Sequence, residues 1–191
     1  MPRRHHNSHD QTQAWHHYTH ALAPAGVALD EVAHHALAGA PLLSFYTPHT
    51  SQPPEPLQPH LVVALTPTRL LTLAVEPATP TTPTADAAVT VDSTWNSAAT
   101  CVPLRRITKI HSLTQHHLTG GTWSPASTLT IHYDGDTTHL SLERTPEGTW
   151  NTATLTGRSL QITAESDPAN LGVNMLTHFA YTLATQLENL T

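Results

Sequence analysis

Two short apolar runs on either side of Thr66-Pro67-Thr68 constrain the fold of this chain more than any other feature. In each run, apolar residues recur at every second position. These positions are Leu61, Val63 and Leu65 in the first run and Leu71, Leu73 and Val75 in the second. Side chains of a β-strand point alternately to the two faces of a sheet, so this period indicates half-buried strands. We therefore predict an antiparallel strand pair over His60–Leu65 and Arg69–Glu76.

The same period of two continues through most of the chain. We expect further strands over Pro41–His49, Ala87–Trp95, Thr100–Leu113, Thr128–Tyr133, Thr137–Glu143 and Ser159–Glu165. The segment Thr100–Leu113 is expected to break near Pro103, and Gly120-Gly121 is expected to form a turn. The best predicted hairpin joins Thr128–Tyr133 to Thr137–Glu143, because Asp134-Gly135 between them is a strong turn signal.

Helical periodicity appears before and after the strands. Apolar residues recur at helical spacing in Thr12–Ala23, and we expect Pro24 and Gly26 to end that helix. A second short helix should follow, with Leu29, Val32, Ala36 and Leu37 on one stripe and stop signals at Gly39 and Pro41.

The C-terminal segment predicts one long amphipathic helix. Its start is expected at Ser166 or Asp167 as the N-cap, with Pro168 in the first helical position. An apolar residue then recurs every four residues, at Leu171, Met175, Phe179, Leu183 and Leu187. Such a stripe suits a helix that packs over an open sheet.

The order of these elements predicts an α+β fold. We expect residues 1–11 to be a disordered tail and 12–191 to be a single domain, with a Pro/Thr-rich exposed loop over residues 77–86. A curved antiparallel sheet of about seven strands, preceded by short helices and closed by a C-terminal helix, is a PH-like architecture.

The composition of the chain limits which partners it can bind and which cellular compartment it can occupy. It has 8 Lys and Arg against 14 Asp and Glu, a formal net charge of −6. This balance argues against nucleic-acid binding. No apolar run approaches the ~18 residues that a membrane span needs. The polar N-terminus (Met1–Asp10) lacks the apolar region of a signal peptide, and the only cysteine permits no internal disulfide, so we expect a cytoplasmic protein.

Several segments resemble those of a known family. They are HHALAGAPLLS (His34–Ser44), VVALTPTRLL (Val62–Leu71), CVPLRRI (Cys101–Ile107) and TLTIHY (Thr128–Tyr133). With them the chain resembles a family of uncharacterised proteins of about this length from high-GC Gram-positive bacteria. The LTPTRL stretch also resembles the Leu-Thr-x-x-Arg-Leu hairpin of bacterial PH-like domains, which a Pro-Leu and an Ile or Val strand usually follow. The resemblance implies a PH-like fold and carries over no activity.

A cluster of cations forms one candidate site. Arg105, Arg106 and Lys109 lie within five residues, and Arg69 is expected on a nearby strand. Along a strand, Arg105 and Lys109 would share one face and Arg106 would take the other. Together these four residues are candidate ligands for a small anion, such as a phosphorylated group or a carboxylate. The alternative is that they are solvated charges beside an apolar strand.

Sixteen histidines offer a second candidate site. His16 and His20 are four residues apart on a predicted helix and share one face, and His5, His6 and His9 could add ligands. The chain has no H-E-x-x-H or C-x-x-C motif, so a histidine-rich composition without a dedicated site is the alternative that we favour. We therefore predict no metal site and no cofactor.

No complete catalytic motif is present in the sequence. Cys101 lies in an apolar strand context, which is typical of a small buried residue. There is no G-x-S-x-G motif and no P-loop. We therefore predict a non-enzymatic binding or assembly module that acts through protein–protein interaction or self-association as a homo-oligomer. The alternatives are a metal-binding protein that uses its N-terminal histidines and an enzyme that acts on a phosphorylated small molecule.

Overall fold

The computed structural model describes residues 8–22, 25–47, 60–77, 95–119, 122–134, 140–141, 153–156, 159–164 and 171–190. Its helices are α1 (Ser8–Ala21), α2 (Ala25–Leu37) and α3 (Leu171–Glu188), with a 3-10 turn, η1, at Leu104–Arg106. Its strands are β1 (Ser44–Tyr46), β2 (His60–Leu65), β3 (Arg69–Pro77), β4 (Trp95–Pro103), β5 (Ile107–Thr119), β6 (Thr122–Tyr133), β7 (Leu140–Ser141), β8 (Ala153–Thr156) and β9 (Ser159–Ala164). The predicted α+β class is confirmed.

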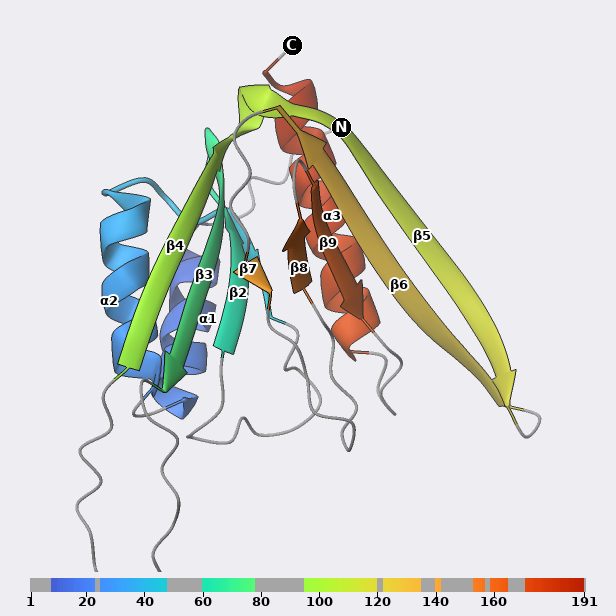
Figure 1. Cartoon of the computed structure of the whole chain (residues 1–191), viewed down its shortest axis with the longest axis horizontal. Helices are drawn as coiled ribbons and strands as arrows, with labels where there is room; N and C mark the ends of the chain where they lie inside the picture. Colours follow the sequence, from blue (N-terminus) through green and yellow to red (C-terminus); the bar gives the residue numbers. More distant parts are fainter. Residues whose placement is uncertain are drawn as a thin grey trace, which may run out of the picture.

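The strands form two antiparallel sheets where the sequence predicted one. The first sheet has the order β1-β2-β3-β4 and the second has the order β5-β6-β9-β8-β7. The chain leaves the first sheet at Pro103, turns through η1 and enters the second at Ile107. The predicted break near Pro103 is therefore confirmed, and it is the corner between the two sheets (Figure 1).

The predicted strand pair is confirmed as β2 and β3, which pair from His60 with Val75 to Leu65 with Leu70. Both strands are buried on both faces rather than on one. Alternate residues supply two different cores, because α1 and α2 cover one face of the first sheet while the second sheet and α3 cover the other (Figure 1). A half-buried strand was predicted from the period of two, which does not show whether the second face of a strand is also covered.

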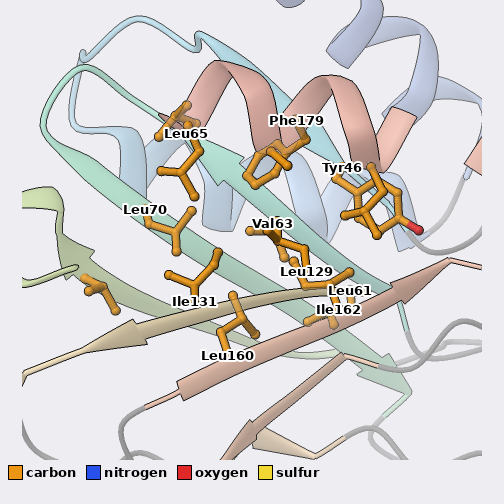
Figure 2. Close-up of a cluster of buried hydrophobic side chains, with 14 of the residues drawn as sticks. Tyr46, Leu61, Val63, Leu65, Leu70, Leu129, Ile131, Leu160, Ile162 and Phe179 are labelled. Atoms are coloured by element: carbon orange, nitrogen blue, oxygen red, sulfur yellow. The ribbon is translucent and has the colours of Figure 1, made fainter. Parts of the chain in front are cut away.

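The inner core lies between the two sheets and α3. Many of its side chains come from β2, β6, β9 and α3, and Figure 2 shows these converging. They are Leu61, Val63, Leu65, Leu129, Ile131, Leu160, Ile162 and Phe179. The predicted inward faces of β6 and β9 are confirmed by this set.

The outer core lies between the first sheet and the helices α1 and α2. Trp15 of α1, Leu22 directly after α1 and Leu29 of α2 pack there against residues of β2 and β3. The indole Nε1 of Trp15 also donates a hydrogen bond of 2.8 Å to Oδ1 of Asp30. This bond ties α1 to α2 and satisfies the one polar atom of a nearly buried ring.

The two N-terminal helices differ from prediction at their ends. α1 begins at Ser8, four residues before the predicted start, and ends at Ala21. Gly26, predicted to end the first helix, lies inside α2 instead, where its lack of a side chain allows α1 to come close. The predicted stop at Gly39 is confirmed, since Ala38 and Gly39 both take positive φ values, of 49° and 78°, directly after the helix.

The best predicted hairpin is wrong. β6 does not pair with the segment after Asp134; its neighbours are β5 and β9, and β7 pairs with β8 at the far edge of the sheet. Leu160 and Ile162 of β9 lie opposite Ile131 and Leu129 and extend the inner core. Two segments could pair with this side of β6: the one that follows the turn and the more distant β9. The local turn signal favours the first, whereas burial of apolar side chains favours β9.

The apolar stripe of α3 differs in detail from the predicted one. Phe179 and Leu183 are fully buried, but Leu171 is largely exposed. An α-helix turns every 3.6 residues, so positions repeated every four residues drift around its axis. The buried face instead follows Val173, Leu176, Phe179, Ala180 and Leu183.

Some predictions fall outside the described residues. These are the tail over residues 1–7, nearly all of the loop over 77–86, most of the strand over 87–95, the turn at 120–121, the Gly-Asp part of the turn at 135–136, and the helix start at 166–168.

Tyr18 joins α1 to the segment after β1 and supports a pH-dependent prediction. Its hydroxyl lies 2.8 Å from Oγ1 of Thr47, and burial raises the pKa of Tyr18 to about 12, partly offset by that hydrogen bond. An unfolded tyrosine ionises near pH 10, so the contribution of Tyr18 to stability is complete below pH 10 and falls by up to about 1.4 kcal/mol per pH unit between 10 and 12.

Replacing Tyr18 with phenylalanine should therefore cost about 1 kcal/mol at pH 9, through loss of the hydrogen bond, and this cost should shrink above pH 10 and reverse in sign as pH approaches 11.5. Urea unfolding of both proteins at several pH values measures this difference. A difference that stays constant from pH 9 to 11.5 would show that the phenol is not shielded from water in the folded protein.

Candidate functional site: the β5–β6 arm

The hairpin of β5 and β6 reaches well beyond the body of the protein. The two strands pair from Ile107 with Tyr133 to Thr119 with Thr122. β9 supports β6 only over Ser127–His132. The remaining part, Gln115–Thr119 paired with Thr122–Ala126, projects past the second sheet, and we call it the arm (Figure 1).

Most described side chains of the arm contact solvent. Gln115, His116, His117 and Leu118 are all exposed, and Leu118 has 57% of its surface accessible. Leu113, just before the arm, is 44% exposed. Leu113 and Leu118 are an odd number of residues apart, so they lie on opposite faces of β5, and both are largely outside the two cores.

Among the described strands, β5 forms a free edge along its whole length. It is the first strand of the second sheet, and no strand in the described part of the chain pairs with its outer side. It runs over 13 residues, about twice the usual strand length. Soluble proteins commonly protect such edges with proline, charged residues or bulges. β5 has no proline and a single charged residue, Lys109, and its only irregularity lies at its start, between Ile107 and Lys109.

Positive charge collects where the arm joins the body. No Asp or Glu occurs anywhere from Ser93 to Tyr133, although the whole chain carries 14. The same segment holds Arg105, Arg106 and Lys109, whose side chains are all exposed. A basic region of this kind on an otherwise acidic protein favours encounter with an anionic group.

The four cations of the predicted anion site do not all have the predicted geometry. Arg105 and Arg106 lie in η1, so the prediction that they project from opposite faces of a strand is wrong. The corner does lie next to β3, because the backbone N–H of Leu104 donates to the carbonyl of Thr68 at 2.9 Å. However, Nη2 of Arg69 donates to the carbonyl of Leu37 at 3.1 Å, which directs that guanidinium to the end of α2.

The histidines of α1 line a shallow hollow. His16, His17 and His20 border a volume of about 460 Å³ together with Thr12 and Gln13. Within the described residues, no group of three or more His, Cys, Asp or Glu side chains is arranged to hold a metal ion. His5 and His6, and the side chain of His9, lie outside the described part.

A second hollow lies where α1, β1 and α3 meet. It has a volume of about 330 Å³, and its lining includes Phe45, Met175, Asn174 and His178. Among the described residues that line it, His178 is the one with an acid–base side chain, and none is Asp, Glu, Lys or Arg.

Cys101 is exposed, so the prediction that it is buried is wrong. It lies on β4, the edge strand of the first sheet, where most side chains from Asn96 to Cys101 contact solvent. The neighbouring Val102 is buried. Edge position rather than residue type sets the exposure of the thiol.

The arm itself was not predicted from sequence. The Gly120-Gly121 turn was expected, but the polar residues on either side of it gave no strand signal that extended to the turn. The one available signal was a Gly-Gly pair of the kind that joins hairpin strands.

Comparisons with known proteins add no further constraint, since no family model, no curated protein and no solved structure matches this chain. None of the helices in the described ranges is both long and apolar enough to cross a membrane.

Proposed function

We propose that this protein is a non-enzymatic binding or assembly module that engages a protein partner, or another copy of itself, through the β5–β6 hairpin. The observation that supports this proposal is the 13-residue free edge of β5, which continues past the body of the molecule. An extended segment that adds to such an edge gains backbone hydrogen bonds along the strand, and the flanking side chains give it specificity.

The body of the protein serves as the rigid support for this hairpin. β6 lies between β5 and β9 in the second sheet, and the part of β6 that pairs with β9 places Leu129 and Ile131 in the inner core. A binding strand fixed in this way loses little conformational freedom when a partner pairs with it, which favours affinity.

We further propose that the fold is PH-like, in a cytoplasmic protein of the high-GC Gram-positive family that the sequence resembles. Two successive antiparallel sheets joined by the η1 corner, with α3 packed against the inner core, support this assignment. The two N-terminal helices and the long arm would then be additions to the PH-like framework.

Binding of a small anion is the second candidate function. The exposed Arg105, Arg106 and Lys109 favour it, because they occupy one corner with no acidic residue in the surrounding sequence from Ser93 to Tyr133. Such a ligand would be phosphorylated or carboxylated. An enzyme that uses this cluster would also need a general base, and none of the predicted site residues supplies one.

A shortened arm tests the proposed function. In this variant, Gln115–Ala126 is replaced by Asn-Gly, so that the facing pair Thr114 and Ser127 is joined by a two-residue hairpin turn. We expect native mass spectrometry of the full chain to show complexes that contain protein only, and the shortened variant to lose them while keeping its thermal unfolding transition.

Native mass spectrometry of the parent protein also distinguishes the proposed function from metal binding and from binding of a phosphorylated small molecule. A monomer that retains a stoichiometric metal ion or a phosphorylated small molecule, with no protein complex, would overturn the proposed function. Equal complex formation by the full chain and the shortened variant would show that the partner binds elsewhere.

A further inference from the structure

We propose that the occupant of the β5 edge is a second copy of this chain, whose β5 pairs antiparallel with the first around a two-fold axis at Thr114. This inference rests on the proposed function and names its partner. The result would be a dimer in which the two second sheets form one continuous sheet.

The backbone of β5 can satisfy such a partner. In an antiparallel pair, alternate residues exchange both of their hydrogen bonds with the neighbouring strand. β6 therefore uses every second residue of β5, and the residues between direct their N–H and C=O groups to the free edge. A second β5 offers the same row of groups in the complementary direction.

The side chains favour one register. With Thr114 on the axis, Ile110 lies opposite Leu118 of the second copy, and Ser112 lies opposite His116 of the second copy. Ile110 packs against the inner core, and Leu118 shares its face of the strand because the two are an even number of residues apart. The exposed Leu118 thus gains an apolar neighbour in each half of the interface, and on this face polar residues meet polar residues between them. On the other face Leu113 lies opposite Gln115 of the second copy.

Charge does not oppose this pairing. Lys109 lies opposite Thr119 of the second copy, so the two Lys109 side chains are ten residues apart along the joined strands. At about 3.4 Å per residue this is roughly 34 Å, several times the screening length of about 8 Å at physiological salt. Arg105 and Arg106 lie further out at each end.

The shape of the molecule leaves room for the pairing. The arm points away from α1, α2 and the first sheet (Figure 1). In an antiparallel dimer, the tip of each arm lies beside the base of the other, so the two bodies stand at opposite ends of the joined hairpins. A strand that ended at the edge of the body would bring the bodies into collision.

Cysteine cross-linking tests the axis directly. In a Cys101→Ser background, Thr114→Cys places the two thiols directly opposite each other on neighbouring strands with Cα atoms about 4.5–5.5 Å apart, which suits a disulfide. His116→Cys is the matched control, because its partner position is Ser112 rather than itself. We expect mild oxidation to convert most of the Thr114→Cys protein to a covalent dimer and to leave His116→Cys largely monomeric.

Sedimentation of the unmodified chain provides the second readout. We expect a dimer, and we expect Leu118→Lys to weaken its association by about tenfold or more, since the change replaces an apolar contact with a charge. A monomer at the highest soluble concentration, or equal cross-linking at positions 114 and 116, would overturn the proposal.

The two proposals fail in different ways. If the chain is monomeric but binds another protein that the shortened-arm variant does not bind, the second-copy proposal falls and the proposed function stands. If neither self-association nor an arm-dependent partner is found, both fall.

Discussion

Phe179→Ala is expected to lower the free energy of unfolding by about 3–5 kcal/mol, a large part of the stability of a domain of this size. Phe179 is fully buried and projects from α3 into the inner core, where side chains of both sheets surround it (Figure 2). Removing the ring forfeits its transfer from water and leaves a cavity that neither sheet can close without moving.

Urea unfolding followed by circular dichroism measures this effect. Tyr181→Ala is the matched control, because Tyr181 lies two residues further along α3 and is 68% exposed, so its loss should change stability by no more than about 0.5 kcal/mol. If both variants lose the same small amount, α3 does not hold the two sheets together.

Gly26→Ala should be the most damaging single-methyl change in the N-terminal layer, at about 1–3 kcal/mol or more. A Cβ at this position would lie far inside the contact distance of the backbone carbonyl oxygen of Thr19. That oxygen belongs to α1 and also accepts the backbone hydrogen bond of Leu22, so it cannot turn aside like a flexible side chain. The two helices must separate, which loosens the contacts of Trp15 and Leu29 with the first sheet.

Helix propensity alone predicts the opposite sign, because alanine is favoured over glycine inside a helix by about 1 kcal/mol. Val27→Ala is the control that separates the steric effect from helix propensity, because it also introduces alanine into α2, at the neighbouring position. Val27 is 71% exposed, so this change should alter stability by no more than about 0.5 kcal/mol. Thermal unfolding of the three proteins is sufficient. A Gly26→Ala protein more stable than the parent would show that α1 and α2 are not in close contact at this point.

The sequence predicted those parts of the fold that depend on local pattern. The alternation in β2 and β3, the break at Pro103 and the presence of a long final helix all follow from residue spacing. The sequence could not predict that β9 displaces the local hairpin partner of β6, because that choice depends on burying Leu160 and Ile162 against residues about thirty positions away. For the same reason the two-sided burial of β2 became visible only once α1 and α2 were placed.

The candidate site divides in the same way. The cluster of Arg105, Arg106 and Lys109 is visible in the sequence, but its geometry depends on a 3-10 turn that the basic residues themselves do not signal. The side chain of Arg69 donates a hydrogen bond to the end of α2 instead, and this is a tertiary contact that local sequence does not signal. Whether a strand lies at an edge is a property of the whole sheet, so no local pattern could identify β5 as the free one.

The continuity of β6 has a mechanical consequence. The strand that forms half of the arm is the same strand that pairs with β9 through six successive residues in the body. A pull along the arm therefore loads those six pairs together, in shear, instead of peeling them apart one at a time. The arm should therefore stay attached to the body under tension along the strand. The same tension would readily detach a hairpin that was joined to the body only by a loop.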